Sequence, residues 1–532
     1  MPISYLSAAQ IAALPTTIID DLSTTKLATL SSTQVGAISA SAVAVLDATQ
    51  VEAFSATQVK GLSATQIPSF GAGVAFNAQQ LAAFSGELVG AMTSTQLAGL
   101  DAAKLDVLGA TQIAAISATN FSGLNATQVA SLDVTQLKGL TVTQMAGLNT
   151  TDIGELAASQ IGGLAASQIG SLEAAAIAAF AAAQLAALST TQIGGMTASH
   201  IAALSGTQLD VLETTQIGAL SAAQVAGLSG TQVSTLSDTQ VGAMNATQLG
   251  GLNETALSTL TATQVASFSA SQIAGLTTTQ IGTLSATDFA ELSATQVGGL
   301  TASQLGALST TNLNALTSTQ IGALTSTQFA GLTATQLGGL GSGDFAELSM
   351  TQIANLTASQ VGGISTSNIS SFNATQVQGL SATQLGGLTS TQLGGLSTTD
   401  IGEFSATQIG GLTASQIGSL SVTNLAALDT TQIGSISPTA MRGLSAYQVR
   451  SLTLDDFNGL NGTQIGALTA TQISALSTTV IGGLTTTQVG YLAPTQIPGL
   501  TVTQLDWLST TNIAAMSPLQ VGAFTPAQVD SL

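Results

Sequence analysis

The 532-residue chain lacks cysteine altogether and has few charged or aromatic residues. The absence of cysteine excludes disulfides, thiolate catalysis and zinc–thiolate sites. A single histidine, His200, gives no basis for a zinc site or for a Ser-His-Asp triad. Only 6% of the residues are charged and 3% are aromatic, whereas roughly 25% are charged in an ordinary soluble domain. We therefore expect a protein that is not an enzyme and that uses no cofactor.

Positive charge is especially scarce. Six Lys and Arg residues stand against 26 Asp and Glu residues, which gives a net charge of -20. Nucleic acids and anionic lipids are bound by clustered positive charge, so neither is an expected partner. The acidic residues are mostly scattered singly, which is typical of a surface that stays soluble and resists non-specific association.

Long apolar runs are missing too, although the composition is apolar overall. The longest, AAAIAAFAAA at 174–183, is too short and too alanine-rich to cross a bilayer. We expect no membrane insertion. The first residues, MPISYLSAAQ, lack the basic and apolar segments of a cleaved secretory signal. We therefore expect either sequence beyond the ends shown or export by another route, and a cytoplasmic location stays open.

The chain consists of an eight-residue repeat from end to end. With Leu380 as position one, Gln384 is position five and Leu385 is position six. Residues 76–532 hold 57 octads, and positions one and six are always Leu, Ile, Val, Met or Phe. Residues 1–69 form an N-terminal block in another register, and residues 70–75 (FGAGVA) form a six-residue break in phase. We expect one elongated domain overall.

The spacing within the octad predicts a short helix followed by a bend. An uninterrupted helix would drift by about 80° per octad, and an uninterrupted strand would place positions one and six on opposite faces. Position two is Ser, Thr, Asp or Asn, which are preferred helix N-caps, and Gln follows three residues later as in a capping box. The apolar residues before the cap and at position six have the spacing of a hydrophobic staple.

Proline and glycine agree with this prediction. Four prolines stand at position three, the first helical residue, where a missing N–H costs nothing: Pro438, Pro494, Pro518 and Pro526. Gly and Ala occupy positions seven and eight, where the helix must end and the chain must turn closely. Helices this short need neighbours. We therefore predict an all-α solenoid of very short capped helices, with positions one and six inside. The alternative is a β-solenoid with Ser, Thr and Gln ladders, which the Thr and Val content favours.

The exceptions at position five reveal a longer period of 56 residues, or seven octads. One series is Asp288, Asp344, Asp400, Asp456 and Asn512, and a second is His200, Ala256, Asn312, Asn368, Asn424 and Val480. Duplication of a 56-residue block explains both series. The alternative is a turn of about 3.5 octads, which would place both series along one face, and the two explanations are compatible.

Acidic pairs recur in the first series. Asp at position five and Glu at position eight share a helix face, so a weak Ca²⁺ site is conceivable at Asp288/Glu291, Asp344/Glu347 and Asp400/Glu403. No pair brings the four or more further oxygen ligands of a calcium loop, and solvated surface acids are the favoured interpretation. We therefore predict no metal site.

The remaining unusual residues have ordinary interpretations. His200 replaces the usual Gln. Tyr491 and Trp507 occupy position eight, from which we expect them to project outward as a small apolar patch. The two arginines, Arg442 and Arg450, are expected to pair with Asp455 and Asp456 at the surface.

The pattern L-[S/T]-x-[T/S]-Q-[I/V/L]-[G/A]-[G/A] covers nearly the whole chain. It resembles the octad arrays of very large bacterial surface or secreted proteins described as adhesin-like. Residues 524–532, FTPAQVDSL, also resemble the first helix of TAL-effector repeats. That likeness is confined to one helix, without the period or the basic surface that DNA binding needs, and implies only a helical conformation.

Together these features predict a structural repeat protein, an elongated rod or filament subunit at a bacterial surface or outside the cell. Low charge and abundant Ser, Thr and Gln suit lateral or end-to-end self-association, and uncapped apolar ends favour it. The alternative is an adhesin stalk with a surface or glycan ligand, or an ice- or crystal-binding module that presents regularly spaced Ser and Thr.

Overall fold

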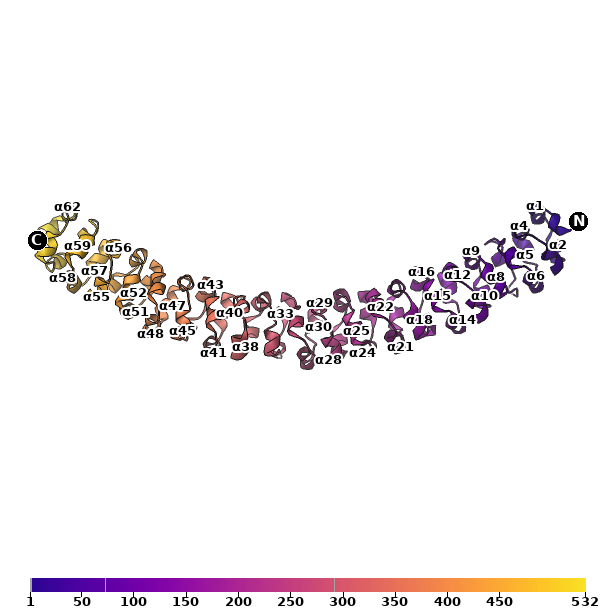
Figure 1. Ribbon diagram of the computed structural model, residues 1–532, viewed down its shortest axis with the longest axis horizontal. Helices are drawn as coiled ribbons and strands as arrows, with labels where there is room; N and C mark the ends of the chain where they lie inside the picture. The colour runs from indigo at the N-terminus through magenta and orange to yellow at the C-terminus, as the bar shows by residue number, and fades with distance from the viewer. Residues whose placement is uncertain (1, 72, 291) are drawn as a thin grey trace. The chain divides into compact units, whose positions relative to one another are not determined.

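The computed structural model describes residues 2–71, 73–290 and 292–532, without the side chain of Asp288. The chain divides into two compact units: the first ends at Phe268 and the second begins at Ser269. This division falls inside the octad array and not at the six-residue break in phase. In each unit the short helices follow one another in chain order (Figure 1).

The described residues form helices and no strand, as predicted. They hold 63 α-helices of four to six residues and three 3-10 helices. In the first unit the α-helices run from α1 (Ala8–Ala12) to α31 (Ala262–Ala266), and in the second from α32 (Ala270–Ile273) to α63 (Pro526–Val529). Nearly every α-helix begins at position three of its octad, directly after the predicted cap. One representative turn of the solenoid comprises α43 (Ala358–Gly363), α44 (Thr366–Ile369), α45 (Ala374–Gln378) and α46 (Ala382–Leu385).

Proline begins a helix at three of the four predicted positions. Pro438, Pro518 and Pro526 are the first residues of α53 (Pro438–Met441), α62 (Pro518–Val521) and α63. Pro494 instead lies in a turn before the 3-10 helix η3 (Ile497–Gly499). This octad carries a second proline, Pro498, whose missing N–H removes a helical hydrogen bond.

Glycine ends the helices for a different reason from the one that the sequence suggests. None of the described residues has a positive φ, so no helix ends in a left-handed glycine cap. The chain leaves each helix through an extended residue at position one, such as Leu396 with φ -69° and ψ 149°. Glycine is needed instead where turns meet. A Cβ at Gly363 would lie 2.6 Å from the carbonyl oxygen of Ala334, on the preceding turn.

The core lies inside the stacked turns. Positions one and six are buried throughout almost the whole array, as predicted; Leu380 is 3% exposed and Leu385 is fully buried. Helices three apart in the chain contact one another, as α43 contacts α46 and α46 contacts α49 (Ala406–Gly410). Each octad alone is too short to cover its apolar pair, so the neighbouring turn supplies the rest of the core.

The break in phase fits within a single turn. Its flanks carry three phenylalanines, and Phe76 packs edge-to-face on Phe70 at 5.1 Å and on Phe84 at 4.9 Å between ring centroids. The amide of Gln80 donates to the carbonyls of Val51 and Phe54, 29 and 26 residues earlier. The corresponding separations elsewhere are 31 and 28 residues, so this turn is shorter by the two residues that the six-residue unit lacks.

Candidate functional site

The capping boxes form as the sequence predicts. In α46 the backbone N–H of Ser381 donates to Oε1 of Gln384 at 2.8 Å. In return, the N–H of Gln384 donates to the Ser381 hydroxyl at 3.3 Å. Two backbone N–H groups at the helix start are satisfied in this way, which contributes on the order of 1 kcal/mol per helix.

The side-chain nitrogen of the same glutamine connects successive turns. Nε2 of Gln384 donates to the carbonyl oxygens of Ile353 at 2.8 Å and Leu356 at 2.7 Å. These acceptors lie 31 and 28 residues earlier. The same pair of separations recurs through both units, for example at Gln144 and Gln472. The bridges join position five to position one of the octad three before it and to position six of the octad four before it. We therefore infer a turn of between three and four octads, near 28 residues, and we call the recurring bridges the glutamine ladder.

This ladder was not predicted from the sequence. Position five was interpreted as a cap alone, yet nearly all of its glutamines are buried; Gln384 is 5% exposed. A signal was present, because Glu completes a capping box as well as Gln does but never occupies position five in any octad. A carboxylate cannot donate to the two carbonyls, so only the amide serves both functions.

Asparagines that replace Gln keep part of the ladder. Nδ2 of Asn368 donates to Leu340 at 2.7 Å, and Nδ2 of Asn424 donates to Leu396 at 2.9 Å, both 28 residues earlier. The shorter side chain keeps this bridge, and the cap is then made by serine alone.

His200 takes the place of a glutamine both in the capping box and in the bridge to the preceding turn. It is 3% exposed. Its Nδ1 accepts from the N–H of Thr197 at 3.1 Å, and its Nε2 lies 2.8 Å from the carbonyl oxygen of Leu172. A carbonyl only accepts, so Nε2 carries the proton and the ring is neutral. Burial lowers the pKa of His200 below its ordinary value, although Leu172 and Glu173 act in the opposite direction.

Two aspartates of the acidic pairs cap the helices on which they lie. Oδ2 of Asp400 accepts from the N–H of Ser397 at 2.8 Å and from the hydroxyl of Ser370 at 3.0 Å. Oδ2 of Asp344 accepts from the N–H of Gly341, and its Oδ1 accepts from the hydroxyl of Ser318. In both cases a serine hydroxyl from the preceding turn donates a hydrogen bond to the aspartate, so the link between turns now runs in the opposite direction.

Glu347 and Glu403, the partners of these aspartates, directly follow α41 (Ser342–Ala346) and α48 (Thr398–Gly402). The Asp288 side chain and Glu291 lie outside the described residues. Within the described ranges, no group of three or more His, Asp or Glu side chains could hold a metal ion. The expectation that the acidic pairs hold no metal ion stays a prediction.

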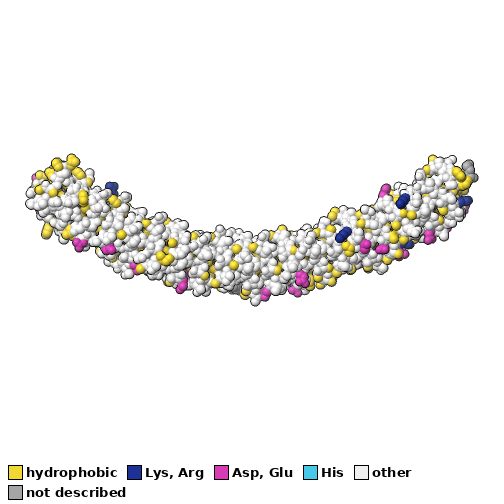
Figure 2. Space-filling view, viewed as in Figure 1, with side chains coloured by type: hydrophobic (Ala, Val, Ile, Leu, Met, Phe, Trp, Pro, Cys, Tyr) yellow, Lys and Arg dark blue, Asp and Glu magenta, His cyan; other side chains and the backbone are white. Residues whose placement is uncertain are grey.

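The surface residues singled out above lie mainly in the second unit. Tyr491 and Trp507 project outward as predicted and are 43% and 57% exposed. Among the described residues the expected arginine pairs do not form: Nε of Arg442 donates to the carbonyl of Ala467 at 3.3 Å, and Asp456 caps its own helix through the N–H of Thr453. On the face seen in Figure 2, charged side chains are few and widely spaced.

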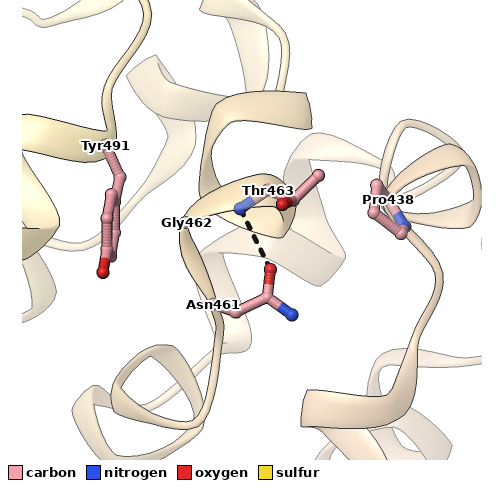
Figure 3. Close-up of a pocket in the computed structure, with 5 residues that line it drawn as sticks. All are labelled: Pro438, Asn461, Gly462, Thr463 and Tyr491. Carbon is pink, nitrogen blue, oxygen red and sulfur yellow. Dashed lines mark hydrogen bonds between the residues drawn. The ribbon is translucent and has the colours of Figure 1, made fainter.

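One hollow in the second unit is lined by residues from three turns: Pro438, Asn461, Gly462, Thr463 and Tyr491 (Figure 3). Its volume is about 620 Å³. The dashed line in Figure 3 marks the bond by which Oδ1 of Asn461 accepts from the N–H of Thr463, at 3.0 Å. The short helix that begins at Gly462, α56 (Gly462–Ala467), lies between Tyr491 and Pro438.

Across the described part of the chain, no helix is long and apolar enough to span a membrane.

Two stretches of the chain, residues 303–334 and 465–502, match the family model of the ALTTAQ repeat. They contain ALTSTQ at 323–328 and ALTATQ at 467–472. No curated protein matches the chain. One solved structure with a partial likeness is described as a homology model of the full-length AP-3 complex in an intermediate open conformation. It is 10% identical, with alignment over 96% of this chain and 84% of that chain, and the TM-score is 0.15. A likeness this small carries no argument about fold or function.

The matching repeat family and the regularly repeated short helices indicate a structural repeat protein with a helical solenoid architecture.

Proposed function

We propose that the chain is a non-enzymatic subunit of a rod or filament, which associates end to end with further copies of itself at a bacterial surface or outside the cell. The observation that supports the proposal is that each turn of the solenoid relies on the next turn to cover its apolar residues. At position six Val521 is 49% exposed and Val529 is 56% exposed, whereas Leu385, in the same position, is fully buried. In interior octads the next turn covers these side chains.

The N-terminal turn of the first unit offers a complementary surface. An apolar hollow of about 430 Å³ is lined mainly by Ile3, Leu6, Leu14, Ile18 and Leu22. Elsewhere in the solenoid such residues pack against the preceding turn. A second copy that stacks its last turn here would cover both apolar faces, and contacts of this head-to-tail kind generate open filaments. Apolar burial is worth roughly 25 cal/mol per Å².

The absence of enzymatic activity is a proposal with its own support. His200, the single histidine, is buried within a cap and bonded at both ring nitrogens. The surface location is supported by the resemblance to octad arrays of large bacterial surface or secreted proteins. Protease treatment of intact source cells tests this location, because a protein inside the cell would survive the treatment.

Sedimentation and electron microscopy of the purified 532-residue chain test the assembly. We expect filaments that lengthen with protein concentration. Val529→Glu and Ile18→Glu should each block one end, so either variant alone should stay monomeric. A mixture of the two should form dimers and nothing longer, because one intact end of each kind remains. Val422→Glu, at a 42% exposed apolar residue on α51 (Val422–Ala426), is the matched control and should leave assembly unchanged.

A wild-type chain that remains monomeric at all concentrations would overturn the end-to-end proposal. Monomers that produced thermal hysteresis would favour the ice-binding alternative instead.

A further inference from the structure

The hollow around Tyr491 gathers three departures from the repeat. Pro438, Asn461 and Tyr491 occupy positions that are most often Ala or Thr, Ser or Thr, and Gly or Ala, respectively. They come from octads of three successive turns, and the solenoid brings them to one surface depression (Figure 3). Three of the four Tyr and Trp residues of the chain, and both of its arginines, lie between residues 442 and 507. The array therefore concentrates its unusual side chains in this region.

The ring of Tyr491 lies against the backbone of Gly462. A Cβ at Gly462 would lie 2.6 Å from Cδ1 and 2.8 Å from Cε1 of the ring, so only glycine lets the ring lie against this backbone. The tyrosine remains 43% exposed at the edge of the hollow. An aromatic side chain with a hydroxyl at its tip has only two side-chain torsions, so it binds apolar area at a small cost in conformational entropy.

Two polar groups beside the ring are free to bind a ligand. Oδ1 of Asn461 accepts from the N–H groups of Thr463 at 3.0 Å and Gln464 at 3.1 Å, which fixes the plane of the amide. The Nδ2 group of Asn461 has no hydrogen-bond partner among the described residues. The Thr463 hydroxyl likewise has none there. The hollow thus offers one oriented donor and one hydroxyl that can donate or accept.

We infer that this hollow binds a neutral saccharide. The apolar C–H face of a pyranose ring would pack on Tyr491, while its hydroxyls would bond to the Asn461 amide and the Thr463 hydroxyl. No charged side chain lines the depression, which disfavours ligands recognised by charge. A volume of about 620 Å³ falls within the ~300–1,000 Å³ of small-molecule sites. This site is independent of the proposed self-association, since none of its residues belongs to the end turns.

Saturation-transfer NMR with maltotriose, lactose and chitotriose as probes tests the site, followed by titration of any that binds. Tyr491→Ala restores a small residue that is common at position eight, so the fold is retained. Asn461→Asp keeps the N-cap and replaces the amide donor by a negatively charged acceptor. We expect each variant to weaken saccharide affinity at least 10-fold. Tyr447→Ala, at a 79% exposed tyrosine on α54 (Ala446–Ser451) outside the hollow, is the matched control and should bind as the wild type does.

Absence of saturation transfer to all three probes, or equal affinity in Tyr491→Ala and the wild type, would overturn the inference. Filament formation by Tyr491→Ala should be unchanged, which separates this outcome from a failure of the proposed assembly.

Discussion

Replacement of Gln384 by glutamate separates the two functions of the glutamine ladder. The carboxylate still accepts from the N–H of Ser381 and keeps the capping box. It cannot donate to the carbonyls of Ile353 and Leu356, which now face a negative charge at a site where Gln384 is only 5% exposed. Two lost hydrogen bonds cost about 1 kcal/mol each. The carboxylate oxygen that replaces Nε2 is buried without a donor, which adds about 1–3 kcal/mol, so the local free energy of opening should fall by about 3–5 kcal/mol.

The matched control is Gln10→Glu in α1. Gln10 forms the same capping box with Ser7, but it is exposed and its Nε2 bridges to no described residue. This variant should change stability by no more than about 0.5 kcal/mol, as exposed substitutions usually do.

Native-state hydrogen exchange is the suitable assay, because a solenoid opens locally rather than as a whole. Amides of the octads around residues 353–388 should lose protection in Gln384→Glu, and acidification should restore part of it as the carboxyl regains a donor. Equal protection in Gln384→Glu and the wild type would refute the bridging role of the amide.

Two further perturbations test close packing and protonation. Gly363→Ala should destabilise the solenoid, because the added Cβ would lie 2.6 Å from the Ala334 carbonyl oxygen. Gly402→Ala, which also alters the last residue of a helix but meets nothing within 4 Å, should be neutral or stabilising by about 0.5 kcal/mol. Thermal unfolding followed by circular dichroism compares the two, and equal melting temperatures would contradict the steric argument. For His200, the lowered pKa means that the unfolded chain binds the proton more readily than the folded one. The stability of the wild type should therefore fall as the pH drops below about 6.5, and His200→Gln should remove this pH dependence in urea unfolding. A fall of the same size in the variant would contradict the assignment.

The sequence predicts the local structure of each octad well, because its signals are local. Cap, glutamine and staple residues lie within five positions of one another, and their chemistry alone specifies a short helix. The outward direction of Tyr491 and the glutamine-like role of His200 follow from the same register.

The contacts between turns were harder to predict. The capping box uses only the side-chain oxygen of Gln384, which is enough to explain a glutamine at this position. The bridge from its Nε2 to Leu356 therefore leaves no sign within a single octad. The hollow at Tyr491 depends on Asn461 and Pro438, and these residues become neighbours only when the turn length is known. The glycines were similarly ambiguous, since helix termination and close approach both favour Gly at the same positions.

The 28-residue turn also gives the 56-residue period a physical meaning. Two turns contain seven octads, so residues 56 apart return to the same side of the solenoid. Asp344 and Asn368, from the two exceptional series, lie on α41 and α44, which contact each other. Alignment along one face is therefore what a turn near 28 residues predicts for the second unit, and it is compatible with duplication of a 56-residue block.

Spin-label distances test the turn of 3.5 octads directly, and the chain is suited to them because it has no cysteine of its own. Thr383, Thr423 and Thr439 are exposed position-four residues of the second unit. Residues 383 and 439 are two whole turns apart, so labels there should lie about 20 Å apart if adjacent turns are spaced by ~8–10 Å. Residues 383 and 423 are separated by about one and a half turns and lie on opposite sides. The Thr383→Cys/Thr423→Cys pair should therefore give the longer distance, although 16 fewer residues separate its labels. A distance that simply increases with sequence separation would contradict the 28-residue turn.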